Sequence, residues 1–197
     1  LKTRDELTQG FRTVTPWIDP KVYNAAMDNT VLFAERCSAV VEKHKMGELL
    51  AAPQLPMGMG SYDNWLFSLC MDGAVDRLGY RPSDDQYADR IRFELERVSG
   101  LGYASYFILA WDIRRWAREN DIFCGPGRGS GGGSLLAYLL RITDLDPIKY
   151  DLSFDRFMAP GRVDAPDFDL DFEHERRQDI IDYLRGKYGE DHVAHIS

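Results

Sequence analysis

Apolar residues three and four positions apart recur along much of the chain, and this spacing predicts a series of amphipathic helices. The first predicted helix begins at Pro20, with Asp19 as its N-cap, and ends near Val41. Further helices are predicted over 63–78, 83–98, 106–117, 135–140 and 173–188, with Ser83 capping the second of these. The Pro- and Gly-containing stretch 51–62 is extended and marks a candidate boundary.

One predicted helix, over 106–117, carries arginines beside its apolar stripe. Arg114, Arg115 and Arg118 lie away from the apolar positions that the spacing picks out. The simplest interpretation is a face of the helix that is exposed to solvent.

A different pattern appears at 167–172, where carboxylates alternate with large apolar residues. This is the period of a β-strand, so the carboxylates are expected on one face and the apolar side chains in the core. The acidic set is Asp167, Asp169 and Asp171, and the apolar set is Phe168, Leu170 and Phe172. A solvent-exposed strand edge would show the same alternation. Residues 122–124 and 193–196 are the other predicted strands.

The acidic stretch contains no Lys or Arg to offset its charge, so a divalent cation is the simplest partner. Mg²⁺ prefers oxygen ligands and commonly binds through one or two carboxylates together with substrate phosphates. The Gly-rich loop over 125–134, with Arg128 and Ser130, suits phosphate contacts, and the helix expected after it would favour anions at its N-terminus. A metal site and a phosphate-binding loop together predict phosphoryl or nucleotidyl transfer.

Two alternatives remain open from the residues alone. Residues 127–132 fit G-x-G-x-x-G between a strand and a helix, as in a dinucleotide-binding (Rossmann-like) domain. Asp144 or Asp146 would then be the downstream acidic residue, although both lie in a Pro-containing turn and no repeated strand–helix units follow. A non-catalytic scaffold is the second alternative. A P-loop is excluded because no Gly-Lys-Ser/Thr is present, and Phe172 stands where an EF-hand loop needs glycine.

Composition narrows the class of protein. The 197 residues carry a net charge of −8 and a pI near 5.0, which argues against a free-standing nucleic-acid binder but not against a catalytic domain assisted by others. Three cysteines without a CxxC favour a reducing, cytoplasmic setting, and no apolar run approaches the length of a membrane span. The chain opens at Leu1 rather than Met and ends at Ser197 after an apolar run, so we expect a segment of a longer polypeptide.

Four motifs in order resemble the palm of the C-family bacterial DNA polymerases, the family of the DNA polymerase III alpha subunit. They are Gly-Pro-Gly-Arg-Gly-Ser at 125–130, Thr-Asp-Leu-Asp-Pro at 143–147, Phe-Asp-Arg-Phe at 154–157 and Pro-Asp-Phe-Asp-Leu-Asp-Phe at 166–172. The resemblance implies an α+β fold, a nucleotidyltransferase-like (DNA polymerase beta-like) palm with a mixed sheet flanked by helices. It assigns 83–197 to an incomplete palm and 1–82 to a helical connecting segment before it.

The resemblance also implies roles for individual residues. Asp167 and Asp169 match the catalytic, metal-binding aspartates, with Asp171 as a neighbouring candidate ligand. Contacts to the phosphates of an incoming deoxynucleoside triphosphate (dNTP) are implied for Arg128, Gly129, Ser130 and Arg156. Two Mg²⁺ ions, a primed DNA template and other replisome subunits are the implied cofactors and partners, with no membrane.

The family's third catalytic aspartate and its fingers are expected beyond Ser197, so we expect this segment alone to be inactive. Residues 173–177 resemble the error-prone branch of the family, which leaves replicative and translesion roles unseparated. The run Gly131-Gly132-Gly133 departs from the family pattern and predicts a looser loop.

Overall fold

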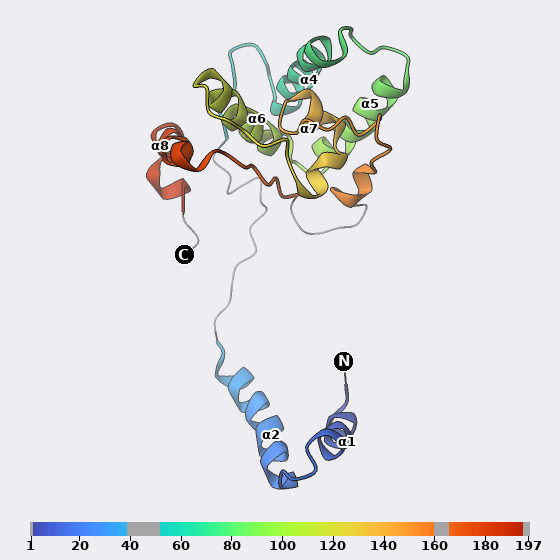
Figure 1. The fold of residues 1–197 in the computed structure, drawn as a ribbon, viewed down its shortest axis with the longest axis vertical. Helices are drawn as coiled ribbons and strands as arrows, with labels where there is room; N and C mark the ends of the chain where they lie inside the picture. The colour runs from blue at the N-terminus through green and yellow to red at the C-terminus, as the bar shows by residue number, and fades with distance from the viewer. Residues whose placement is uncertain (1, 39–51, 160–165, 195–197) are drawn as a thin grey trace. The chain divides into compact units, whose positions relative to one another are not determined.

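The computed structural model describes residues 2–38, 52–159 and 166–194 of the chain. It divides the chain into two compact units, Leu1–Lys43 and His44–Ser197, which we describe separately (Figure 1). No helix in the described residues is both long and apolar enough to cross a membrane.

The first unit is a pair of helices, α1 (Arg4–Val14) and α2 (Pro20–Arg36). Asp19 caps α2 by accepting a hydrogen bond from the Lys21 N–H, and Pro20 occupies the first turn, as the sequence predicts. The rings of Phe11 and Tyr23 stack with centroids 5.4 Å apart and hold the two helices together. The predicted end of the second helix near Val41 lies outside the described residues.

The second unit is built from helices around a main apolar core and a smaller apolar cluster. The helices are α4 (Tyr62–Leu78), α5 (Gln86–Gly100), α6 (Ala104–Glu119), α7 (Leu135–Leu139) and α8 (Arg177–Tyr188), with 3₁₀ turns η1 (Gly129–Gly133), η2 (Phe154–Arg156), η3 (His174–Arg176) and η4 (Glu190–His192). The short α7 lies at the centre, packed against α4 and α5, while α6 packs against α4 (Figure 1). The buried apolar side chains include Leu66, Phe107, Ile108, Leu135 and Leu136. Burying a side chain of this size stabilises a fold by about 1.5–3 kcal/mol.

Local capping signals explain most helix boundaries. Ser61 accepts from the Asn64 N–H at the start of α4, and Gly79 ends that helix in the left-handed conformation, as its position in the sequence predicts. The cap of α5 is Asp85 rather than the predicted Ser83, because the Asp85 carboxylate accepts from the Ala88 N–H at 2.9 Å.

The predicted fold class, an α+β palm with a mixed sheet flanked by helices, is wrong for the described residues, which form helices and no β-strand. The predicted strands at 122–124 and 167–172 meet only through two isolated antiparallel bridges, Cys124 with Phe172 and Arg128 with Asp169. A regular ladder starting at the first bridge would place Gly127 opposite Asp169. The loop instead has one extra residue, as in a bulge, and Gly127 takes a φ of +92° there, so the ladder is not continued.

Two other sequence predictions concern the edges of the second unit. Residues 62–78, assigned above to a connecting segment, form α4, which belongs to the same compact unit as α6 and α7. The assignment of 83–197 as a palm stays a prediction. The strand predicted at 193–196 is absent at Val193 and Ala194, and its last two residues lie outside the described residues.

Candidate functional site

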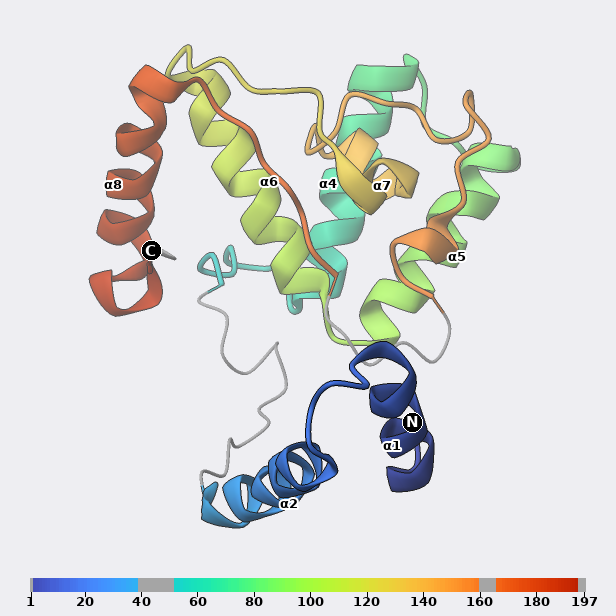
Figure 2. The same cartoon turned by 60° about the horizontal axis from the view of Figure 1, so that its bottom comes forward.

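The acidic segment runs against the Gly-rich loop. The Arg128–Asp169 bridge joins them directly, and the Gly125 N–H donates to the Asp171 carbonyl at 3.0 Å. The alternation inferred from the sequence is confirmed, because Phe168 and Leu170 pack against the main core and Phe172 against a smaller apolar cluster. Figure 2 shows this segment running along α6 on its way to α8.

Tyr106 of α6 fixes the segment in place. Its hydroxyl accepts a hydrogen bond from the Phe168 N–H at 2.9 Å, and the two rings stack with centroids 5.4 Å apart. Phe168 also meets Phe107 edge-on at 5.1 Å. The apolar face of the segment therefore holds the acidic face at the surface, where Asp167 and Asp171 are exposed and Asp169 is half-buried.

Arg128 supplies the positive charge that the acidic stretch itself lacks. Its Nη1 lies 3.1 Å from Asp169 Oδ2, and its Nε donates to Asp171 Oδ2, also at 3.1 Å. The two carboxylates therefore share one cation, the Arg128 guanidinium. Asp167, Asp169 and Asp171 do not converge as a three-ligand cluster in the part of the chain that the structure describes.

The glycines of the loop are needed for close packing. Gly129 has a φ of +71°, and a Cβ there would lie 3.0 Å from Asp169 Oδ2. A Cβ on Gly131 would lie 2.9 Å from the Phe168 ring. Gly131, Gly132 and Gly133 are all buried within η1, and the looser loop that this run predicts stays a prediction.

A pocket of about 550 Å³ opens beside the loop. It is lined by Gly129, Ser130, Gly132, Gly133, Leu145, Leu152, Ser153 and Arg156. The structure therefore brings together three of the four predicted phosphate-binding residues. The fourth, Arg128, faces the aspartates instead.

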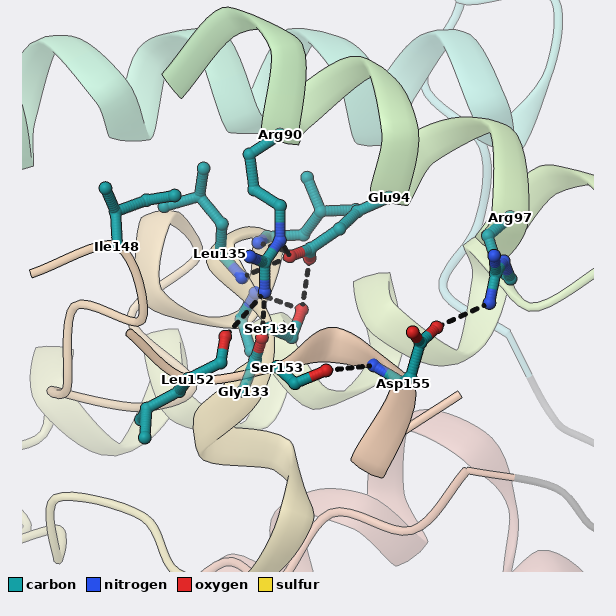
Figure 3. Close-up of polar contacts among 12 residues, drawn as sticks. Arg90, Glu94, Arg97, Gly133, Ser134, Leu135, Ile148, Leu152, Ser153 and Asp155 are labelled. Carbon is teal, nitrogen blue, oxygen red and sulfur yellow. Dashed lines mark hydrogen bonds and ion pairs between the residues drawn. The ribbon is translucent and has the colours of Figure 1, made fainter. Parts of the chain in front are cut away.

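The N-terminus of α7 is not open to a ligand anion, contrary to the sequence prediction. The buried carboxylate of Glu94 from α5 accepts from the backbone N–H groups of Leu135 at 2.9 Å and Leu136 at 3.2 Å, and from Ser134 Oγ at 2.8 Å (Figure 3). Because this internal carboxylate fills the place where a dinucleotide would put its pyrophosphate, the geometry disfavours the Rossmann-like alternative.

Arg90 completes this network one helical turn before Glu94. Its Nε donates to Glu94 Oε1 at 2.6 Å, and its Nη2 donates to the carbonyls of Gly133 at 2.7 Å and Leu152 at 3.0 Å (Figure 3). Burial raises the pKa of the Glu94 carboxyl, and the donors around it act in the opposite direction. One feature of the sequence could have revealed this network. The charged residues Arg90 and Glu94 lie on the same face of their predicted helix as the apolar Ile91 and Val98.

Arg114 was also missed, because the solvent-exposed interpretation of its helix face is wrong for this residue. Its side chain is buried, and its Nη1 donates to the Gly125 carbonyl at 2.8 Å, at the start of the Gly-rich loop. Arg114 lies four residues after Ala110 and three before Ala117, so the three residues share one face of α6. Both alanines are buried, which was the sign that Arg114 is buried too.

Comparison with known proteins places the chain in a family. Residues 64–197 match the family described as the bacterial DNA polymerase III alpha NTPase domain. The DNA polymerase III subunit alpha of Borreliella burgdorferi is 43% identical over 196 residues, which cover 100% of this chain and 16% of the relative. The subunit of Treponema pallidum is 42% identical over 168 residues, 85% of this chain and 14% of the relative. That of Escherichia coli K12 is 39% identical over 179 residues, 87% of this chain and 15% of the relative.

The chain thus spans only about a sixth of the length of these relatives. Within that span, similarity at this level extends over most of the chain and includes both the acidic segment and the Gly-rich loop that the fold brings into contact. The family resemblance drawn from the motifs is confirmed, and the chain belongs to the family of the bacterial DNA polymerase III alpha subunit.

Proposed function

We propose that this chain contributes the catalytic centre for template-directed DNA synthesis, in which a dNTP transfers its nucleotidyl group to a primer 3′-hydroxyl. The observation that carries the proposal is the Arg128–Asp169 bridge, which holds the acidic segment against the Gly-rich loop. One cation-bound triphosphate can then reach both segments. Family membership supports the same activity.

Asp167 and Asp169, with Asp171 as a neighbouring candidate, are the residues that would hold Mg²⁺ here. Two carboxylates together with substrate phosphates are a common Mg²⁺ donor set, so the absence of a three-ligand cluster among the described residues does not oppose it. Two bound Mg²⁺ ions would activate the attacking hydroxyl and stabilise the pyrophosphate leaving group. The carboxylates themselves orient the reacting groups.

The pocket beside the loop is the place that we propose for the triphosphate. Its floor is buried glycine backbone, and its polar groups are Ser130, Ser153 and Arg156. Arg156 can stabilise charge on the phosphate oxygens. Arg128 is the further phosphate contact, which requires it to leave the aspartates when a metal neutralises them.

The primed template and other replisome subunits are the proposed partners, and a cytoplasmic location follows from that activity. Because the chain covers so little of its relatives, we propose that residues 1–197 alone do not extend a primer.

Primer extension by the complete polypeptide that carries this chain tests the proposal. Asp169→Ala and Asp167→Ala are expected to lower the rate by at least about 100-fold, since each removes a group that organises charge at the reacting phosphate. Asp89→Asn serves as the control, because this aspartate of α5 has an exposed side chain and lies outside the acidic segment. Unchanged synthesis in both aspartate variants would instead identify a scaffold.

A further inference from the structure

A second pocket, of about 430 Å³, lies on α6 and the residues that follow it. It is lined by Arg114, Arg118, Asp121, Ile122, Phe123, Cys124, Arg141 and Asp144. It shares no lining residue with the pocket beside the Gly-rich loop, so it is a separate cavity. Three guanidinium groups against two carboxylates give its lining a positive balance.

Most charges around this pocket are already paired. Asp144 accepts from Arg77 at 2.7 Å and lies 3.4 Å from Arg114, while Arg141 donates to Asp76 at 2.6 Å. The buried Arg114 also donates to two backbone carbonyls, so its side chain is held in place. The walls of the pocket are therefore preorganised.

Two charged lining residues, the exposed Asp121 and the half-buried Arg118, form no ion pair among the described residues, and Arg118 is the cation of the two. No carboxylate of the described residues lies within ion-pair distance of it, and the only hydrogen bond it makes there is from Nη1 to the Arg141 carbonyl at 3.2 Å. Burial and the like charges of Arg114 and Arg141 lower the pKa of this half-buried guanidinium. An anion in the pocket would relieve that repulsion.

We propose that this pocket binds a phosphate group, with Arg118 as the main contact and Arg114 and Arg141 as the surrounding positive charge. A guanidinium presents several N–H donors in a plane, which matches two oxygens of one phosphate. The phosphate comes either from the backbone of a nucleic acid or from a free oxyanion such as pyrophosphate. The site does not depend on the function proposed above.

Cys124 offers a reporter for this binding, since its thiol is part of the lining and is half-buried. The experiment measures the alkylation rate of Cys124 by peptide mass spectrometry, in the complete polypeptide that carries this chain. The probes are pyrophosphate, a single-stranded oligonucleotide, and the same oligonucleotide with an uncharged methylphosphonate backbone, all at one ionic strength. Burial raises the pKa of the Cys124 thiol, and the positive charges of Arg114 and Arg118 act against it. Because a change at Arg118 therefore alters the rate without probe, the informative quantity is the ratio of rates with and without probe in each variant.

A phosphate-bearing probe is expected to slow alkylation at least about fivefold in the wild type, and this protection is expected to fall below about twofold in Arg118→Ala and Arg118→Gln. Arg118→Lys should keep part of it. Arg81→Ala removes an exposed arginine that pairs with Asp72 and does not line the pocket, so this variant should behave as wild type. Circular dichroism identifies the variant, Ala or Gln, that retains the fold.

The probes separate the two sources. Protection by pyrophosphate alone assigns a free oxyanion, whereas protection by the charged but not the methylphosphonate oligonucleotide assigns a nucleic-acid backbone. Protection by none of the probes, or equal protection in the folded Arg118 variants, would overturn the proposal.

Discussion

Arg128 balances the charge of the acidic segment. Its guanidinium is the cation between Asp169 and Asp171, and its side chain is 61% exposed, so each ion pair is worth only about 0.2–1 kcal/mol. Replacing it with Ala removes the cationic side chain with which both carboxylates pair among the described residues. We therefore expect Arg128→Ala to bind Mn²⁺ about threefold more tightly when no nucleotide is present.

Titration of Mn²⁺ by electron paramagnetic resonance measures this change. Arg92→Ala is the matched control, because the Arg92 side chain is 63% exposed and also pairs with an aspartate. If Arg128→Ala binds Mn²⁺ no better than the control, the arginine does not compete for the aspartates in solution.

Glu94, unlike the exposed Arg128, is buried, and its carboxylate accepts hydrogen bonds from several donors at once. Glu94→Ala would leave Arg90 and the first N–H groups of α7 without this acceptor, and we expect it to cost about 3–5 kcal/mol. Glu94→Gln keeps an amide oxygen at the same place and should cost less, about 1–2 kcal/mol. Urea denaturation measures both, with exposed Glu96→Ala as the control on the same helix. A loss below about 1 kcal/mol in Glu94→Ala would show that the network is not needed.

At the scale of the helices, α8 is joined to α6 by several hydrogen bonds to one side chain. The Asp112 carboxylate on α6 is buried and accepts from Tyr183, Lys187 and Tyr188 of α8 at 2.6–2.8 Å. The Trp116 and Tyr183 rings stack beside it with centroids 4.4 Å apart. Burial acts to raise the pKa of Asp112, but these donors outweigh it and hold that pKa below its ordinary value.

This lowered pKa makes the docking of α8 sensitive to acid. The folded state favours the charged form of Asp112, so this carboxylate contributes its full stabilisation above the pKa of an aspartate in the unfolded chain, which is about 4. That stabilisation is lost as the pH falls through the lower pKa of Asp112 in the folded state. Asp112→Asn is therefore expected to cost about 2 kcal/mol near pH 7, with the difference from wild type shrinking below pH 4. Urea denaturation at several pH values tests this. A difference that stays constant down to pH 3 would contradict it.

Those elements whose signals are local could be predicted from the sequence. Asp19 and Pro20 start α2, and Gly79 ends α4, because each acts on backbone groups within a few residues. The alternation at 167–172 gave the correct buried face for the same reason.

Contacts between distant segments could not be predicted in this way. Whether 122–124 and 167–172 form a sheet depends on the extra residue at Gly127, which no periodicity reveals. The role of Glu94 depends on a helix that begins 41 residues later, at Leu135. In the candidate site, the motifs pointed to the aspartates and the loop. They did not show that Arg128 pairs with the carboxylates, because that pairing depends on which charges the fold brings close together.

For the molecule as a whole, the second unit has a core of its own. Every residue of its main apolar cluster lies at or after Leu55, including Met59 and the buried Trp65. We therefore expect a chain of residues 44–197 to unfold cooperatively, with a free energy of unfolding within about 1 kcal/mol of the value for the same transition in residues 1–197.

A chain that starts at Tyr62 is the informative comparison. It lacks Leu55 and Met59, which pack on the core, and Ser61, whose side chain caps α4. Losing the cap costs about 1 kcal/mol, and losing the two partly buried apolar side chains adds a similar amount each. Urea denaturation followed by far-UV circular dichroism should therefore show the 62–197 chain less stable than 44–197 by about 2–3 kcal/mol. Equal stability of these two chains would mean that the core begins at α4, and a molten 44–197 chain would mean that residues 1–43 are part of the same folding unit.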